Sequence, residues 1–528
     1  MTTQDDLPDV ETVAAAERLA GIDFTPKERE QMRRALADAL GRAAERRALP
    51  VTNGLAPAET FDPWLGAAPP AGAFGHRFDP ASEPGGVPDA PSDDADLAFA
   101  PVVHLASWLA DRSVTSRRLV EVSLARIERL DPQLEACITV DAEGARAAAD
   151  RADAELAAGR NRGPLHGVPY GLKDLFDTKG LRTTFGAEPY RERVPDGDAA
   201  VVERLREAGA VLVAKTALGA LAYGDVWFGG RTNNPWNVRQ GSSGSSAGSC
   251  AGVAAGLFPF AIGTETYGSI VSPSARCGTV GLRPTFGRVS RAGAMALCWS
   301  LDKVGAIARR VDDTALVLAA IAGEDRRDGG SRAIGGAPAA GLDVSELRVG
   351  ANAAWFRTGS PELRALDALR ELGCEVVEVA LPEGPWGSLV TLLHVEAAAA
   401  FEDLTRSGDD DRLVWQDDEA WPNTFRSAWF VPAIEFVKAQ RLRRTLCEGM
   451  ARAFLGVDLV LAPNDAADLL WTTNLTGQPS LTLRCGVDGG RPRTVTLWGK
   501  LAGEGALVAA GRALEERLGV WQVRPELG

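Results

Sequence analysis

GSSGSSAGSCAGVAAGLFPFAIGTETYGSIVSP, residues 241–273, is the stretch that decides the fold, and it holds seven serines and no histidine. Its first residues have the composition of a flexible Gly/Ser linker. The small residues, however, continue directly into CAGVAAGLFPFAIG (250–263), which is apolar and must be buried. The pattern therefore predicts a turn that enters a buried helix and leaves backbone N–H groups free at the helix start. No lysine follows the glycines, so a Walker-type phosphate loop is excluded.

A serine nucleophile here needs a base, and the chain offers two. Residues 244–248 match the GxSxG elbow of α/β-hydrolases, whose base would be His394, although the preceding RTNNPWNVRQ does not resemble the strand that this fold requires. The other candidate is Lys173 in GVPYGLKDLFDTKG (167–180). Only 7 of the 57 basic residues are lysine, so a position that keeps lysine can indicate a need for that residue. Chemistry is one such need, because arginine cannot be deprotonated and therefore cannot act as a base. Its apolar neighbours predict burial, which lowers a lysine pKa. For this residue taken alone, an ion pair of Lys173 with Asp174 or Asp177 at a strand end is the favoured interpretation.

Composition narrows the class of protein. The 528 residues carry a net charge of −14, which disfavours nucleic acid or an anionic membrane as a partner. No run of eighteen apolar residues predicts a membrane span, and the acidic N-terminus does not resemble a signal peptide. Seven scattered cysteines without CxxC spacing indicate reduced thiols and a cytoplasmic location. With four histidines (His76, His104, His166 and His394) and no HExxH, we expect neither a metal nor a cofactor.

The chain changes character along its length. Residues 10–47 read as helical, with a helix start at Thr25-Pro26-Lys27-Glu28. Residues 50–100 are rich in Pro, Gly, Asp and Ala and predict an extended connector, and 328–341 predict a long surface loop. From about residue 101, helical and strand patterns alternate, which favours an α/β sheet covered on both faces. The predicted helices are 116–130 and 142–159, and the predicted strands are 209–216, 347–355, 374–381, 457–464 and 493–500. We therefore divide the chain into an N-terminal extension (1–95) and a catalytic domain (96–528).

Several long motifs together resemble the amidase signature family, over roughly residues 101–520. The motifs are GPLHGVPYGLKD (163–174), NNPWN (233–237), SGSSAGSCAGVAAG (243–256), GTETYGSI (263–270), CGTVGLRPTFGRVS (277–290) and NLTGQPSL (474–481). The resemblance implies an α/β fold with a large, mixed, twisted sheet, here with a helical N-terminal extension. It also implies a Ser–cis-Ser–Lys triad, in which Ser269 is the nucleophile, Ser245 the bridging serine after a cis peptide, and Lys173 the base.

The resemblance implies further site features. The N–H groups of Thr266, Tyr267, Gly268 and Ser269 would form the oxyanion hole. The family usually has DTGGSIR where this chain has ETYGSIV, so Tyr267 and Val271 replace a glycine and an arginine and put substrate specificity in doubt. Lys173 must be neutral to act as a base, so we expect Asp174 to point away from its amine.

The substrate pocket is expected in and around LAYGDVWFGG (221–230). The substrate-binding candidates are Tyr223, Asp225, Trp227, Phe228 and Ser246, and a rim of aromatic residues is expected from Trp415, Trp421, Trp429 and Phe430.

The main functional hypothesis is an amidase that hydrolyses a small-molecule amide, or an ester or carbamate, through a serine acyl-enzyme. The first alternative is the glutamine-hydrolysing A subunit of a tRNA-dependent amidotransferase, because residues 10–30 resemble the helical C subunit of that complex, fused in cis. The second is a non-catalytic binding protein on the same fold. Residues 1–95 are expected to serve packing or assembly, and the sequence leaves open whether the protein forms a homodimer.

Overall fold

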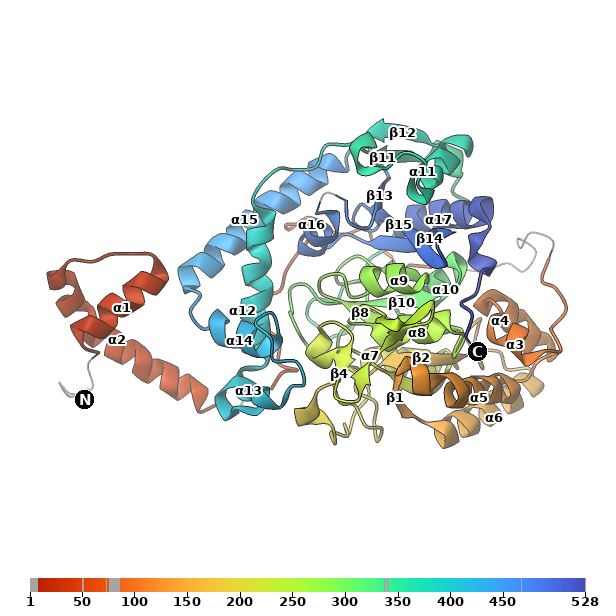
Figure 1. The fold of residues 1–528 in the computed structure, drawn as a ribbon, viewed down its shortest axis with the longest axis horizontal. Coiled ribbons are helices and arrows are strands. Elements are labelled where there is room, and N and C mark those ends of the chain that lie inside the picture. Colours follow the sequence, from red (N-terminus) through yellow and green to blue (C-terminus); the bar gives the residue numbers. More distant parts are fainter. Residues whose placement is uncertain are drawn as a thin grey trace.

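A mixed sheet of eleven strands organises the computed structural model, which describes residues 8–49, 52–72, 74–75, 86–336, 339, 341–466 and 468–527 (Figure 1). Along the sheet the strands follow the order β1-β3-β2-β8-β10-β9-β14-β15-β13-β11-β12. Their bounds are β1 Cys137–Val140, β2 Pro169–Lys173, β3 Val211–Thr216, β8 Phe260–Glu265, β9 Val280–Arg283, β10 Lys303–Ala308, β11 Arg348–Ala351, β12 Glu375–Glu378, β13 Leu459–Pro463, β14 Ser480–Asp488 and β15 Arg491–Gly499. Strand β2 is parallel to β3 and β8, and β11 is parallel to β12 and β13, whereas the other pairs are antiparallel. The predicted fold class is confirmed.

The middle of the sheet is shielded on both faces. Every residue of β2, β8 and β10 is buried, which requires cover on both sides because successive side chains point to opposite faces. The principal helices of the body are α4 Val102–Asp111, α5 Ser116–Leu134, α6 Ala142–Ala157, α7 Ala200–Glu207, α8 Ala247–Ala254, α9 Val271–Cys277, α10 Val311–Ile321, α11 Pro361–Glu371, α12 Val390–Ala400, α13 Glu402–Ser407, α14 Trp421–Ala428, α15 Ala433–Ala453, α16 Leu469–Thr476 and α17 Glu504–Leu518.

Helix α8 is the buried helix that the small-residue stretch predicts. All eight of its residues are buried, and it contacts β2, β8 and β10. Small side chains are needed for this approach: a Cβ added at Gly248 would lie 2.0 Å from the Ala136 carbonyl oxygen, and one at Gly252 would lie 2.3 Å from the Phe258 ring. The Gly/Ser run is therefore a packed element and not a linker.

Residues 10–47 are helical as predicted, but in two helices. Helix α1 (Val10–Ala20) ends at Gly21, whose φ of 65° is left-handed, and α2 (Pro26–Arg47) begins at the Thr25–Glu28 capping box that the sequence indicates. The pair projects away from the rest of the molecule, at the end of the view where the N-terminus lies (Figure 1). Large apolar side chains on it are exposed, including Leu19 and Leu40.

The connector that follows packs onto the body. The Phe61 ring meets Phe286 edge-on at 5.2 Å between ring centroids, and the Arg443 guanidinium lies 3.4 Å from the centroid of the Phe61 ring. Phe74 is buried. Phe74, together with Leu97, Ala98 and Ala100 at the end of the connector, thus belongs to the same core as the sheet.

The expectation of a surface loop at 328–341 is wrong for much of that segment. Ser331 and Ile334 are buried, and Arg288 donates to the carbonyl oxygens of Ile334 and Gly335 at 2.7 and 3.0 Å. Asp328 is also buried and forms an ion pair with Arg291. The segment lacks regular secondary structure among its described residues, but side chains of the body satisfy its backbone groups, which lets it lie inside.

Candidate active site

Two parallel neighbouring strands bring the site together. Lys173 is the last residue of β2, and β8 beside it ends at Glu265, immediately before the 266–270 loop. Because parallel strands end at the same edge of a sheet, Lys173 and this loop meet there. Ser245 and Ser246 lie in the turn that enters α8, which packs on both strands.

Lys173 is wholly buried and is held by hydroxyl groups. Its Nζ lies 2.8 Å from Ser245 Oγ, 2.8 Å from Thr264 Oγ1 and 3.2 Å from Ser246 Oγ. Burial lowers the pKa of Lys173 to about 7, although Asp302 and Glu265 act in the opposite direction. A substantial fraction of the amine is therefore neutral near pH 7 and able to accept a proton.

Asp174 points away from the Lys173 amine, as expected. Its carboxylate lies 3.1 Å from Lys215 Nζ and accepts hydrogen bonds from the Thr184 hydroxyl (2.6 Å) and the Thr184 N–H (2.8 Å). Lys215 also donates to the Phe176 carbonyl oxygen. The structure thus separates two buried lysines: Lys215 has a carboxylate partner, whereas the hydrogen bonds of Lys173 in the described part of the chain go to hydroxyl and carbonyl oxygens.

The two serines of the turn have different places. The Gly244–Ser245 peptide is cis, as the resemblance implied, and Ser245 directs its hydroxyl at Lys173. Ser246 is fully buried; its N–H donates to the Ser269 carbonyl oxygen at 3.2 Å, and its hydroxyl donates to the Thr264 carbonyl oxygen at 3.1 Å. Ser246 therefore connects the turn before α8 to the segment of Ser269 and to Thr264 beside Lys173. Its buried position does not support the substrate contact that the sequence predicted for it.

Ser269 lies in the loop that follows β8, and its side chain is 7% exposed. Within the described ranges its hydroxyl makes no hydrogen bond, and the N–H groups of Tyr267, Gly268 and Ser269 donate none either. The next two N–H groups, of Ile270 and Val271, are taken by the Glu265 carboxylate at 2.7 and 2.9 Å. The loop therefore keeps three backbone donors around the Ser269 hydroxyl available for an oxyanion.

Glu265 is a site residue that the sequence reasoning missed. It forms a fully buried ion pair with Arg283 and accepts a hydrogen bond from Asn474 Nδ2 at 2.8 Å. Burial alone would raise the pKa of Glu265, but Arg283 and the Val271 N–H outweigh it and hold the pKa below its usual value. The signal was present in GTETYGSI, where one acidic residue stands among residues that must be buried.

Replacing Glu265 by glutamine is expected to lower the free energy of unfolding by about 3–5 kcal/mol, because the buried Arg283 charge loses its partner. Urea denaturation of both proteins measures the change. The matched control is Glu375→Gln, which removes an exposed pair with Arg348 and should cost less than about 1 kcal/mol. Equal effects of the two substitutions would show that the buried pair does not stabilise the loop.

The aromatic residues expected to bind substrate are brought together only in part. The Tyr223 ring, 38% exposed, contacts the rings of Trp415 and Trp421 at centroid distances of 4.9 and 5.1 Å. Trp227 is buried against Phe228.

Asp225 accepts from the Ser243 N–H at 2.9 Å, and burial raises its pKa. This hydrogen bond therefore holds the turn that precedes Ser245.

The remaining aromatic candidates differ in exposure. Trp421 is buried, and its Nε1 donates to the Leu221 carbonyl oxygen, whereas Trp429 and Phe430 are exposed. Tyr267, which stands where the resemblance has a glycine, is 48% exposed and packs on the Trp471 ring at 4.5 Å. Its bulk thus lies on the outer side of the loop that follows β8.

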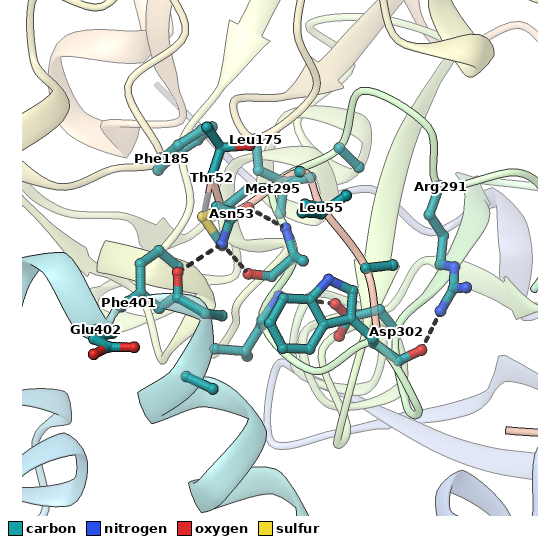
Figure 2. A pocket seen from close by; sticks show the side chains of 18 of the residues that line it. Thr52, Asn53, Leu55, Leu175, Phe185, Arg291, Met295, Asp302, Phe401 and Glu402 are labelled. Carbon is teal, nitrogen blue, oxygen red and sulfur yellow. Dashed lines mark hydrogen bonds between the residues drawn. The ribbon is translucent and has the colours of Figure 1, made fainter. Parts of the chain in front are cut away.

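A cavity of about 1280 Å³ adjoins the site (Figure 2). Thr264 and Thr266, on either side of Glu265, line one part of it, and the connector residues 52–57 line another. The residues that line it include neither Ser245 nor Ser269, so it approaches Lys173 from the side of Thr264, whose hydroxyl contacts the Lys173 amine. None of the four candidates Tyr223, Asp225, Trp227 and Phe228 lines it.

The described residues contain no cluster of three or more His, Cys, Asp or Glu that could hold a metal. His76 lies outside those residues. All seven cysteines are free thiols. Among the helices that the structure describes, none has the length and apolar character needed to cross a membrane.

Known proteins resemble the chain over most of its length. The family model described as Amidase matches residues 118–468. The A subunit of the glutamyl-tRNA(Gln) amidotransferase of Anaeromyxobacter sp. (strain K) is 35% identical over 478 residues, covering 79% of this chain and 96% of that protein; its counterpart in Roseiflexus sp. (strain RS-1) is 36% identical, covering 78% and 95%. Among solved structures, the native peptide amidase of Stenotrophomonas maltophilia matches with a TM-score of 0.73 and 31% identity, covering 81% of this chain and 98% of that one.

Proposed function

Because the chain belongs to the amidase family, we propose that it hydrolyses the C–N bond of a carboxamide through an acyl-enzyme on Ser269. The observation that carries this proposal is the buried Lys173 amine, 2.8 Å from the Ser245 hydroxyl and with a pKa lowered to about 7. An ordinary surface lysine, with a pKa of about 10.4, would be almost wholly charged and unable to start the reaction.

In the acylation step, neutral Lys173 takes the proton of Ser245 as Ser245 takes that of Ser269. The Ser269–Ser245 hydrogen bond that this requires forms with substrate in place. Ser269 Oγ attacks the carbonyl carbon, and the negative charge that develops on its oxygen is stabilised by the N–H groups of Tyr267, Gly268 and Ser269. Ser245 then returns a proton to the amide nitrogen, the C–N bond breaks, and the amine or ammonia leaves.

Deacylation repeats the same proton transfers with water. A water molecule loses a proton towards Ser245 and attacks the ester carbonyl, the bond to Ser269 Oγ breaks, and Ser269 recovers its proton. The products are a carboxylic acid and a free amine, and Lys173 ends neutral, as it began. The proton that Ser269 loses leaves with the amine, the proton that water loses restores Ser269, and in each step Lys173 gives its proton back to Ser245, and no electrons are exchanged.

A second candidate is the glutamine-hydrolysing A subunit of a tRNA-dependent amidotransferase. The curated relatives favour it over a free-standing amidase. The two relatives that are 35–36% identical, and that are matched over nearly their whole length, are both A subunits of the glutamyl-tRNA(Gln) amidotransferase. The α1–α2 pair, which resembles a C subunit fused in cis, projects from the body with exposed apolar side chains and is consistent with an assembly. The free-standing amidase is supported by the structural match to the peptide amidase.

One panel separates these functions. A fluorophosphonate probe is expected to label Ser269, and the purified chain is expected to release amine or ammonia from simple carboxamides. Ammonia release from glutamine that rises when glutamyl-tRNA is added would support the amidotransferase alternative. Absence of labelling at Ser269 in the folded protein would contradict the hydrolase and favour a non-catalytic binding protein.

A further inference from the structure

A short segment of the connector, residues 52–57, lines the cavity beside the active site and is here called the strap. Figure 2 shows Thr52, Asn53 and Leu55 among the side chains that surround the cavity. The strap contacts parts of the body that are distant in sequence, since Ala296 lies 243 residues from Asn53. A part of the chain expected to serve packing or assembly therefore borders the space next to Lys173.

Asn53 fixes the strap to two separate parts of the body. Its Nδ2 donates to the carbonyl oxygens of Ala296 and Ala400 at 2.8 and 3.2 Å, and its Oδ1 accepts from the Ala296 N–H at 2.9 Å. Three hydrogen bonds from one half-buried side chain use most of what an amide can make. Ala296 precedes β10, and Ala400 ends α12, so Asn53 holds the strap at a point where these two cavity-lining segments come together.

Part of the cavity surface is apolar. Leu175, Phe185, Met295 and Phe401 are buried residues that line it, and the strap adds Leu55. Leu55 is 61% exposed, two residues along the strap from Asn53. An apolar group in the cavity would cover it, and burying apolar area contributes about 25 cal/mol for each Å².

Several of the charged groups around the cavity are neutralised within the protein. Asp177 pairs with Arg193 at 2.7 Å, Asp328 with Arg291 at 2.8 Å, and Glu402 with Arg406 at 2.5 Å. Asp302 is half-buried and accepts from the Thr266 hydroxyl and from the N–H groups of Leu297 and Cys298. These carboxylates and guanidinium groups are thus already satisfied and do not need a charged ligand.

From these observations we infer that the strap completes the substrate-binding cavity, that Asn53 is the positioning residue that holds it, and that Leu55 selects amides whose non-reacting part is apolar. The inference rests on the proposed C–N hydrolysis. It names the class of substrate: a carboxamide that carries an alkyl or aryl group on either its acyl or its amine side, in place of a charged or zwitterionic group.

The test uses the full chain and three amides: acetamide as the small reference, hexanamide with a longer acyl part, and N-hexylacetamide with a longer amine part. Wild-type kcat/KM is expected to be at least about tenfold higher for one of the two longer amides than for acetamide. Leu55→Asp should lower kcat/KM for the preferred longer amide by about tenfold, mainly by raising KM. It should change kcat/KM for acetamide by no more than about twofold. Asn53→Ala should have the same selective effect, because the strap is no longer held.

The matched control is Leu455→Asp, since Leu455 is 84% exposed and does not line the cavity. It should change none of the three rates. If Leu55→Asp does not fold, as judged by its melting temperature, Leu55→Ser takes its place with the same expectation. A wild type that prefers acetamide, or a Leu55 variant that lowers all three rates equally, would overturn the inference.

Failure of the inference is distinct from failure of the proposed function. A chain that hydrolyses glutamine or acetamide but neither longer amide retains the Ser269 chemistry and refutes the apolar cavity. A chain that hydrolyses no amide and whose Ser269 is not labelled by a fluorophosphonate refutes the hydrolase itself.

Discussion

Replacing Ser269 by alanine is expected to lower kcat on any amide substrate by about 10⁴-fold or more, the range seen when the nucleophile of a serine hydrolase is removed. The fold should survive, because the side chain is small and the Ser269 hydroxyl has no hydrogen-bond partner among the described residues. The free energy of unfolding should change by about 1 kcal/mol or less. Steady-state kinetics with active-site titration, together with urea denaturation, measure both quantities.

Two control variants accompany Ser269→Ala. Ser272→Ala removes a half-buried hydroxyl three residues along the same segment, and its N–H bond to the Gly268 carbonyl oxygen is kept. His394→Ala removes the base that an α/β-hydrolase elbow would need. Both should retain most of the activity. If kcat of His394→Ala fell by several orders of magnitude while Ser269→Ala stayed active, the nucleophile would instead be Ser246 in an α/β-hydrolase elbow.

The second large effect concerns Lys173. Because burial lowers its pKa to about 7, the fraction of neutral amine rises as the pH passes through that value. Activity is therefore expected to rise with pH through an ionisation near 7 and then to level off. Lys173→Ala should lower kcat by about 10³-fold or more and remove this ionisation. Lys173→Arg should not restore activity, because arginine stays charged.

The same shift predicts a pH dependence of stability. Between about pH 7 and pH 10 the unfolded chain keeps the Lys173 proton and the folded chain does not, so the free energy of unfolding should rise with pH by about 1.4 kcal/mol for each unit. Lys173→Ala should lack this contribution, whereas Lys438→Ala, at an exposed lysine paired with Glu435, should keep it.

For the kinetic prediction, an active Lys173→Arg variant, or a pH–rate profile that is unchanged in Lys173→Ala, would show that the base is another group.

The sequence was sufficient for the fold class because its signals are local and repetitive. Alternating helix and strand patterns predict the sheet, and the predicted strands 209–216, 457–464 and 493–500 contain most of β3, β13 and β15. The strands β8, β10 and β14 were not recognised, since fully buried strands lack the alternation of polar and apolar residues that marks a half-exposed one. The surface loop expected at 328–341 failed because Gly-rich composition does not reveal which side chains elsewhere will satisfy its backbone.

At the site, the sequence by itself determined which residue types could carry out the chemistry: a lysine among apolar neighbours, serines among glycines, and a small-residue helix able to pack closely. Only the tertiary structure decided how they meet. It pairs Asp174 with Lys215, so that the Lys173 amine contacts the hydroxyl groups of Ser245 and Thr264, and it pairs Glu265 with Arg283 next to the loop that carries Ser269. It also brings Asn53 to the backbone of Ala296 and Ala400. The physical reason is that burial, pKa and pairing depend on groups brought together from distant parts of the chain, and such distances are set by the packing of the sheet, not by the order of the residues.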